Sequence, residues 1–263
     1  TDALKSIIYS NGKFIAVNDN GNIYYSNDGK EWTLLSGFSA GGDLNGIAYG
    51  NDIYVTLGNA SKSFVSTNGT NWTEHSNGAL ENFYGLCFGN GKFIAVGDSG
   101  KIFYSSDGIT WSNDVGQGSE QLNCLTYGDG IYVTGANGGV IYYSTDGINW
   151  PVTNKFESGE GGLGFWGICY GANKFIAVGL DQFGGRIAYY STDGKNWNKS
   201  QGPSGNGTLF GVTYGAGKFV AVGDGGIIYY STDGKSWSLA NNPGTNALWS
   251  VAYLQYNPEY IAP

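Results

Sequence analysis

Several residue types are scarce in this chain of 263 residues. It contains no methionine, a single histidine (His75), a single arginine (Arg186) and three cysteines. One histidine cannot form a metal site of several histidines, and the sequence predicts neither a metal nor another cofactor. The missing methionine indicates a processed product or a segment of a larger protein.

The three cysteines lack the close pairing that a zinc knuckle requires. Cys87, Cys124 and Cys169 each fall within a predicted strand. Because thiols are small and only weakly polar, they are often buried, and we expect three free thiols in the core.

Basic residues are also few, since 13 of them face 21 acidic residues and the formal net charge is −8. An acidic surface repels phosphate groups, so nucleic acids and anionic membrane surfaces are not expected as partners. No uncharged apolar run approaches the roughly 18 residues that cross a bilayer, which argues against membrane insertion.

Glycine and aromatic residues are abundant instead. The chain has 46 glycines, 20 tyrosines and 8 tryptophans, whereas charged residues make up only 13%. Strands favour aromatic side chains and tight turns favour glycine. The composition therefore predicts an all-β protein.

One heptapeptide recurs six times along the chain. Its form is clearest in Ser191-Thr-Asp-Gly-Lys-Asn-Trp197 and Ser231-Thr-Asp-Gly-Lys-Ser-Trp237. A period of about 40 residues is typical of repeat architectures. The motif tryptophans lie 40, 39, 39, 47 and 40 residues apart, at Trp32, Trp72, Trp111, Trp150, Trp197 and Trp237.

Each repeat carries four strand patterns. In the third repeat, residues 83–88, 92–96 and 101–105 form the first three, and the fourth is expected to start at the motif tryptophan. Such units cannot bury both faces alone, so they stack around an axis. We therefore predict one β-propeller domain over residues 1–263, with four-stranded antiparallel blades at about 4–43, 44–82, 83–121, 122–164, 165–208 and 209–247.

The last residues, 248–263, begin a seventh repeat. Residues 248–253 match a first strand and residues 259–262 match a second. Two arrangements stay open: seven blade positions with a two-stranded last blade, or six blades with a packed extension. The surplus keeps the apolar pattern of buried strands, which slightly favours seven.

The Asp-Gly or Asn-Gly step of the motif has a structural explanation. A hairpin between the third and fourth strands needs a residue with positive φ, which glycine adopts without strain. The carboxylate or amide before it accepts hydrogen bonds from turn amides. These positions lie about one blade apart, so we expect them to stabilise turns rather than to share a metal ion.

The motif resembles the Asp-box, or BNR, repeat of sialidase-like propellers and of related photosystem assembly-factor and glycosidase propellers. The resemblance spans residues 4–243, although one residue is missing between aspartate and tryptophan of the usual Ser-x-Asp-x-Gly-x-Thr-Trp pattern. It implies the fold and leaves the activity open, because many functions share this repeat. Sialidases hold the substrate carboxylate with three arginines, and this chain has only Arg186, so sialidase activity is not expected.

Candidate carboxylates for glycoside hydrolysis lie between second and third strands. A glycosidase needs two carboxylates roughly 5 to 10 Å apart across the scissile bond. Asp19, Asp98 and Asp224 share one repeat position, and each has a glycine within two residues. They are predicted to be turn formers.

Other candidates for catalysis are isolated. Asp181 stands in an enlarged loop of the fifth repeat, and Glu157 and Glu160 lie in the long connection before it. A hydrolase built there remains open, although no pair can be assigned. His75 follows the second motif, and we expect a solvated side chain on an outer strand rather than a general base.

A binding site is predicted where the repeat breaks down, on the face that carries the loops into first strands and the loops between second and third strands. One first-strand position on this face varies strongly. Its aromatic members either pack between blades or form a platform for a sugar ring or a partner. The residues at this position are Lys5, Asn45, Tyr84, Asn123, Trp166, Phe210 and Trp249.

The fifth repeat departs most from the others. It has the 47-residue spacing and a long loop that contains the single arginine. Long loops on a rigid scaffold often carry binding, although a tolerated insertion is the alternative. The predicted ligand-binding residues are Trp166, Asp181, Gln182 and Arg186, flanked by Tyr84, Phe210 and Trp249.

These observations favour a non-catalytic binding module of a secreted, surface or phage-type protein that recognises a glycan or a protein through one propeller face. An extracellular or cell-surface location goes with this hypothesis. A polysaccharide-active glycoside hydrolase or lyase is the alternative, and a scaffold that acts through protein contacts alone is a third.

Overall fold

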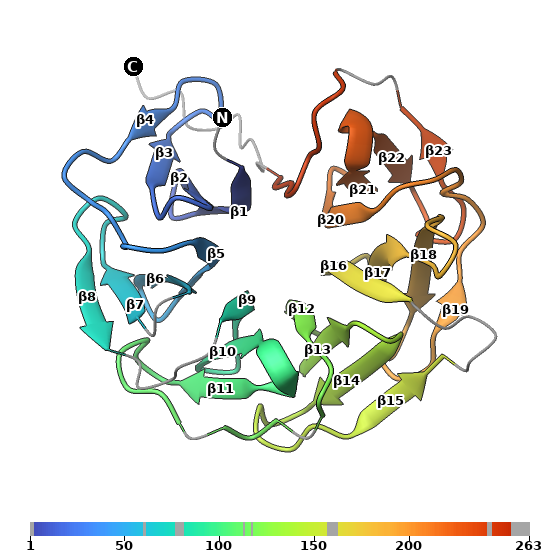
Figure 1. Cartoon of the computed structure of the whole chain (residues 1–263), viewed down its shortest axis with the longest axis horizontal. Helices are drawn as coiled ribbons and strands as arrows, with labels where there is room; N and C mark the ends of the chain where they lie inside the picture. The colour runs from blue at the N-terminus through green and yellow to red at the C-terminus, as the bar shows by residue number, and fades with distance from the viewer. Residues whose placement is uncertain are drawn as a thin grey trace.

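A computed structural model describes residues 3–59, 62–76, 82–112, 114–116, 118–156, 163–240 and 244–253. Within these ranges six antiparallel sheets surround a central axis and form a β-propeller, as predicted (Figure 1). No helix in the described ranges is long and apolar enough to span a bilayer.

Each sheet is one blade, and its strands follow one another outward from the axis (Figure 1). The first three blades hold β1 (Leu4–Ser10), β2 (Lys13–Asn18), β3 (Ile23–Ser26) and β4 (Thr33–Leu34); β5 (Leu44–Gly50), β6 (Ile53–Gly58), β7 (Lys62–Ser66) and β8 (Thr73–Ser76); β9 (Phe83–Gly89), β10 (Lys92–Gly97) and β11 (Ile102–Ser105). The next three hold β12 (Leu122–Gly128), β13 (Ile131–Ala136), β14 (Val140–Ser144) and β15 (Val152–Lys155); β16 (Gly164–Gly171), β17 (Lys174–Leu180), β18 (Arg186–Ser191) and β19 (Asn198–Lys199); β20 (Leu209–Gly215), β21 (Lys218–Gly223), β22 (Ile228–Ser231) and β23 (Ser238–Leu239). Short 3₁₀ turns, η1 (Asp98–Gly100) and η2 (Asp224–Gly226), join the second and third strands of the third and sixth blades.

The core lies between neighbouring blades. Val133 and Ile141 of the fourth blade pack in one cluster with Phe165 and Phe175 of the fifth, and all four are buried. Removing such side chains from water is the main favourable term in folding, at about 25 cal/mol per Å² of apolar surface. Each blade is therefore stabilised mainly by its neighbours, as the repeat pattern predicts.

Inner strands of neighbouring blades approach one another so closely that only glycine fits at some positions. An added Cβ at Gly171, the last residue of β16, would lie 2.2 Å from the Tyr214 ring of β20. The tyrosine of one blade thus covers the glycine of the blade before it. This contact explains why the first-strand pattern ends in aromatic-Gly along most of the chain.

The repeated heptapeptide forms the turn between the third and fourth strands. In the fourth blade, the N–H groups of Ile148 and Asn149 donate to Oδ1 of Asp146 at 2.8 and 2.9 Å, and Ser144 Oγ donates to the same oxygen. Gly147 follows with φ of +76°. The structural interpretation of the motif is confirmed.

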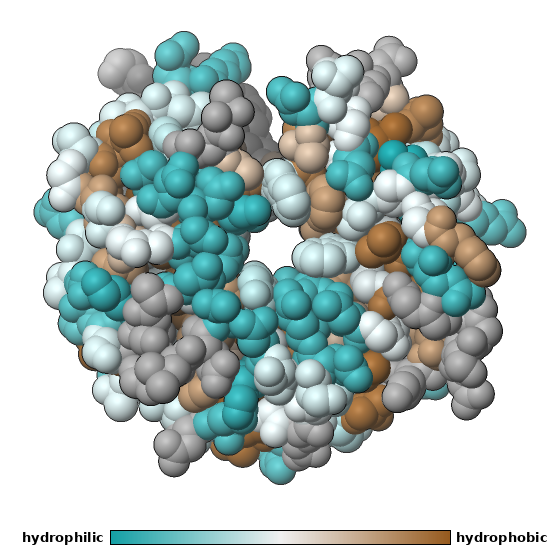
Figure 2. Space-filling view, in the orientation of Figure 1, coloured by the Kyte–Doolittle hydropathy of each residue, from teal (hydrophilic) through white to brown (hydrophobic). Residues whose placement is uncertain are grey.

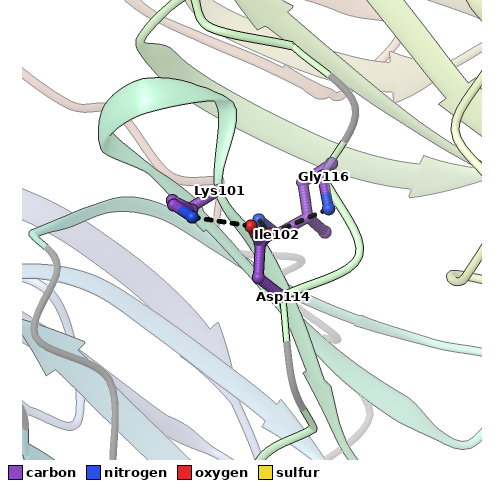
Figure 3. Close-up of polar contacts among 4 residues, drawn as sticks. All are labelled: Lys101, Ile102, Asp114 and Gly116. Atoms are coloured by element: carbon purple, nitrogen blue, oxygen red, sulfur yellow. Dashed lines mark hydrogen bonds and ion pairs between the residues drawn. The ribbon is translucent and has the colours of Figure 1, made fainter.

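The third blade has no fourth strand within the described residues, and side chains replace part of the missing pairing. The N–H of Ile102 donates to Asp114 Oδ1 at 3.0 Å, and the N–H of Gly116 donates to the same oxygen at 2.8 Å (Figure 3). Lys101 forms an ion pair with Asp114 at 2.9 Å. Burial raises the pKa of Asp114, but Lys101 and the two amides outweigh it and hold the pKa below 3.8.

Fourth strands in the other blades are short and begin after the motif tryptophan rather than at it. For example, β19 starts one residue beyond Trp197. The indole of Trp197 instead turns back over the hairpin, and its Nε1–H donates to Gly194 O at 3.2 Å. The tryptophan therefore serves the turn more than the strand ladder.

Residues 248–253 lie beside β20 as each inner strand lies beside the one before it. An added Cβ at Gly215 would lie 1.9 Å from the Tyr253 ring, which repeats the relation between Gly171 and Tyr214. The N–H of Leu248 donates to Gly223 O at 3.1 Å. The described part of the seventh repeat thus occupies a seventh inner position. The predicted second strand at 259–262 lies outside the described residues.

Candidate functional site at the mouth of the axial channel

A cavity of about 570 Å³ lies on the propeller axis, and Figure 2 shows the opening at the centre of the molecule. All seven members of the variable first-strand position line it. They bring Lys5, Asn45, Tyr84, Asn123, Trp166, Phe210 and Trp249 into one ring from seven separate chain segments.

A β-bulge holds this position in each of the six blades. In the fifth blade the pairing with β17 passes from Phe165 to Gly167 and skips Trp166, and the sixth skips Phe210 in the same way. A residue in a β-bulge does not pair in the strand ladder, and its side chain points in a different direction from those of its neighbours. Each blade therefore places at the mouth of the channel one side chain that strand pairing does not constrain, and the sequence varies at this position.

Two asparagines of the ring join neighbouring blades. Asn45 Nδ2 donates to Phe83 O of the next blade at 2.8 Å, and Asn123 Nδ2 donates to Phe165 O at 3.1 Å. Asn123 is 7% exposed, and its Oδ1 has no hydrogen-bond partner among the described residues. Each asparagine thus uses its amide donor to join two blades, and the Asn123 oxygen without a partner is itself buried.

Three of the four aromatic members, Trp166, Phe210 and Trp249, occupy the last three positions of the ring, whereas Tyr84 lies between Asn45 and Asn123. Phe210 stacks on Trp249 with centroids 4.2 Å apart, and Trp166 stands nearly perpendicular to Phe210 at 6.2 Å. Lys5 Nζ sits 4.0 Å from the centroid of the Trp249 ring. Two groups so close to one ring must occupy opposite faces, so Trp249 is packed on both sides and joins the last position to the first blade.

The interpretation that aromatic members pack between blades fits Phe210 and Trp249, and the platform for a ligand stays a prediction. Trp166 also contacts Phe210 of the next blade through its ring, and both Trp166 and Tyr84 are half-buried. Burial raises the pKa of Tyr84, and its hydrogen bond with Asp98 adds to the effect. Tyr84 therefore keeps its hydroxyl proton as a donor at neutral pH.

Asp181, Gln182 and Arg186 lie on the same face but outside the cavity lining. Leu180 pairs with Gly164 at the start of β16, which places the loop one strand outward from Trp166. Asp181 Oδ1 accepts from the N–H groups of Phe183 and Gly185 at 2.9 and 2.7 Å, and so holds its own turn. The structure therefore brings four of the seven predicted site residues together and separates the other three.

Arg186 contacts the neighbouring connection rather than the channel. Its Nη1 donates to Ser204 O at 3.3 Å, and an added Cβ at Gly207 would lie 2.9 Å from Nη2. The loop tip carries Phe183, which is 82% exposed.

The other candidate carboxylates also stabilise loops. Asp19 Oδ1 accepts from Ala3 N–H at 3.0 Å, Asp98 Oδ2 accepts from Asn82 Nδ2 at 2.9 Å, and Asp224 Oδ2 accepts from Thr208 N–H at 2.8 Å. All three join the second-to-third-strand loop to the start of the same blade. The prediction that they are turn residues is confirmed, whereas Glu157 and Glu160 lie outside the described residues.

The other residues considered for chemistry are His75 and the three cysteines, of which Cys124 lines the cavity. His75 lies on the outer strand β8, opposite Ser63 of β7, as predicted. The three cysteines lie on inner strands as free thiols, and burial raises the pKa of Cys124 to about 12. Among the residues that the structure describes, no group of three histidine, cysteine, aspartate or glutamate side chains could hold a metal ion.

The site predicted from the sequence includes the aromatic members of the ring and omits its polar members. Asp43, Asn45, Asn59, Gln121 and Asn123 also line the cavity. Asn45 and Asn123 occupy the same repeat position as the chosen aromatics, which was the signal available. Asp43, Asn59 and Gln121 lie at loop positions that only folding brings to the channel.

No family model and no curated protein matches the chain. Solved structures match along most of its length. A streptogramin B lyase has a TM-score of 0.79 at 12% identity, with 95% of this chain and 87% of that chain covered. Virginiamycin B lyase from Staphylococcus aureus has a TM-score of 0.78 at 15% identity, covering 90% and 84%.

A structure of YCF48 bound to D1 peptide has a TM-score of 0.67 at 15% identity and covers 91% of this chain and 81% of that chain. The shared feature is the β-propeller. At such low identity the likeness establishes the fold, and it assigns neither the Asp-box family nor an activity.

Proposed function

We propose that this chain is a non-catalytic binding module whose ligand is a glycan that enters the axial mouth. The observation that carries the proposal is the division of the lining. Trp166, Phe210 and Trp249 lie on one side, and amide side chains such as Asn45 and Asn123 lie on the other. A sugar ring has apolar C–H faces for aromatic contact and hydroxyls for amides, and a cavity of about 300 to 1,000 Å³ suits a small ligand.

The placement of reactive groups supports binding rather than turnover. Asp19, Asp98 and Asp224 are engaged in loop hydrogen bonds. One lyase of the same fold is catalytically inactive in a histidine-to-alanine form solved with quinupristin. The single histidine of this chain, His75, lies on outer strand β8, so the chain offers no imidazole to the channel.

Glycan-array binding tests the proposal. We expect the wild-type chain to bind at least one glycan, and Trp166→Ala to lose that signal because an aromatic contact of about 1 kcal/mol or more is removed. Phe183→Ala is the matched control, since it removes an aromatic ring from the same face but outside the cavity. An empty array, or equal loss in both variants, would contradict a glycan site in the channel.

A protein-binding scaffold is the second candidate. The loop that carries Phe183 is rigidly held, because Gly184 O accepts from Gly207 N–H at 2.7 Å and Gly205 O accepts from Arg186 N–H at 3.0 Å. A preorganised, exposed aromatic residue is typical of protein-binding anchors. YCF48, a propeller of similar shape, was solved with a peptide bound. For a scaffold, Phe183→Ala would abolish partner binding and Trp166→Ala would not.

A polysaccharide hydrolase or lyase centred on the fifth blade makes a different prediction. Wild-type protein would then degrade a polysaccharide and Asp181→Ala would not. Asp181 holds its own turn, so the thermal stability of Asp181→Ala is measured as well. A loss of activity that comes with a loss of stability is assigned to the turn and not to catalysis. A secreted or surface location is part of the proposal, because glycans of cell surfaces and matrices are encountered there.

A further inference from the structure

One face of the sixth blade is less covered than the corresponding faces of the other five. The third residue of the second strand is 0% exposed in five blades, where it is Ile15, Val55, Ile94, Val133 or Ile176. Val220 holds this position in β21 and is only half-buried. Three residues before the motif serine, the side chain is likewise 0 or 1% exposed in five blades, at Ile23, Ser63, Ile102, Ile141 and Ala188. Ile228 holds that position in β22 and is again only half-buried.

The interface between the fifth and sixth blades shows what covers these two positions elsewhere. Ile176 and Ala188 of the fifth blade pack in one buried cluster with Phe219 and Trp237 of the sixth. An added Cβ at Gly234, the glycine of the motif turn, would lie 2.4 Å from Ile176 Cδ1. The motif glycine makes the same contact at three earlier interfaces, between Gly69 and Ile15, Gly108 and Val55, and Gly147 and Ile94. The cover is therefore a hairpin of the next blade, made of its second and third strands and its motif turn.

The first blade is also poorly covered on the side that faces the sixth (Figure 1). The motif tryptophan packs against the preceding blade, as Trp237 does, and Trp32 of the first blade is 36% exposed against 8% for Trp237. No residue of β1 is buried, whereas each of the other five inner strands buries several. The two blades thus present apolar side chains to the same place, which a seventh blade would occupy.

Residues 248–253 fill only the innermost part of this place. They lie beside β20, but no strand pairs with them among the described residues, whereas each of the six inner strands pairs with a second strand. Unpaired N–H and C=O groups along such an edge are a template for an added strand. Residues 248–263 contain no glycine, and all six copies of the motif belong to the six blades. This sequence therefore does not supply a hairpin that covers Val220 and Ile228 as the motif hairpins cover the other blades.

We propose that the place between the sixth and first blades is a docking site for a β-hairpin of a second polypeptide. The hairpin adds a strand to residues 248–253 through main-chain hydrogen bonds, and it sets an aromatic side chain and a turn glycine against Val220 and Ile228. Burial of these apolar side chains drives the docking, at about 25 cal/mol per Å². Neither Val220 nor Ile228 lines the channel cavity, so the inference does not depend on the proposed glycan binding.

A synthetic peptide of residues 218–239 is the probe, because this segment is the hairpin that covers the fifth blade. Fluorescence anisotropy of the labelled peptide measures its binding to the full chain. We expect saturable binding of one peptide per chain. A peptide that carries Phe219→Asp should bind at least about tenfold more weakly, because the carboxylate would be buried without a partner.

Variants of the full chain locate the site, with the peptide kept unchanged. Val220→Asp and Ile228→Asp should each weaken binding at least about tenfold for the same reason. Val152→Asp is the matched control, since Val152 is an exposed apolar residue on the outer strand β15 of the fourth blade. Thermal unfolding of the three variants checks that the propeller is intact.

Hydrogen exchange tests whether a strand is added. The amides of residues 248–253 should exchange at least about tenfold more slowly when the peptide is saturating, because exchange slows when an amide forms a main-chain hydrogen bond. Hydrophobic adhesion of the peptide elsewhere would leave these amides unchanged.

Three results would overturn the inference, and none of them bears on glycan binding. The first is no binding of the peptide to the full chain; if deletion of residues 254–263 also lowers Tm, that segment covers the place instead. The second is binding that Val220→Asp and Ile228→Asp leave unchanged, or that Val152→Asp weakens equally. The third is binding without slower exchange at residues 248–253, which would exclude strand addition.

Discussion

Replacing the motif aspartate of the fourth blade tests whether the repeated motif is a structural turn. Asp146 Oδ1 accepts from the N–H groups of Ile148 and Asn149 and from Ser144 Oγ, and Oδ2 accepts from Asn149 Nδ2 at 2.7 Å. Asp146→Ala removes all four hydrogen bonds. Each contributes about 0.5–1.5 kcal/mol net in a protein, and the position is partly exposed, so we expect a loss of about 2 kcal/mol.

The second blade provides a natural control. Asn68 stands at the equivalent position, and its Oδ1 accepts from the N–H groups of Thr70 and Asn71 at 2.9 and 2.8 Å. Asp146→Asn should therefore keep the two backbone contacts, lose mainly the contact to Asn149 Nδ2, and cost less than about 1 kcal/mol.

Denaturant titration followed by tryptophan fluorescence measures both variants, and calorimetry gives the midpoint. For a domain of this size, about 2 kcal/mol corresponds to a drop of roughly 4–8 °C in Tm. A loss below about 0.5 kcal/mol in Asp146→Ala, or equal damage from Asp146→Asn, would refute the turn explanation. A Tm that falls on addition of a chelator would instead favour a metal-binding motif.

Three further expectations follow from the same structure. The amides of Asn149 and Ile148 lower the pKa of Asp146 from 3.8, so the contribution of Asp146 to the free energy of unfolding is complete above that pH and is lost as the pH falls through the folded-state pKa. The stability difference between Asp146→Asn and the wild type should therefore shrink below pH 3.8 in acid titrations. Burial raises the pKa of Cys124 to about 12 and also raises that of Cys169. A thiolate-specific reagent at pH 8 should therefore label the native chain far more slowly than the unfolded chain, and equal labelling rates would contradict the burial of these thiols. Lys5→Met should lower the free energy of unfolding by about 0.5–1 kcal/mol because it removes the cation–π contact with Trp249, and an unchanged value would show that this contact does not help close the ring.

The repeat is the part of the fold that sequence reasoning predicted well. Four strands per unit, the Asp-Gly turn and the position of His75 on an outer strand all follow from local patterns that recur. Local patterns failed where a side chain replaces a strand. In the third blade Asp114 and Ser112 accept from strand β11, and no repeat pattern indicates such a substitution.

The candidate site was only half predictable. Trp166 and Phe210 were chosen because they break the repeat, and the structure places both on the channel. Asp181 and Arg186 were chosen for the same reason, and they lie in a loop that is held by its own hydrogen bonds. A break in a repeat indicates a local change, but it does not say whether the changed residue faces the axis or the rim.

By itself, the sequence determined the strands, the turns and the propeller, because each depends on contacts within about 40 residues that recur six times. Only the tertiary structure decided which side chains share the channel. The β-bulges aim one residue per blade at the axis, and residues as distant as Lys5 and Trp249 meet when the ring closes. The division of the lining into aromatic residues and amide side chains arises from that closure, because the two groups come from different blades.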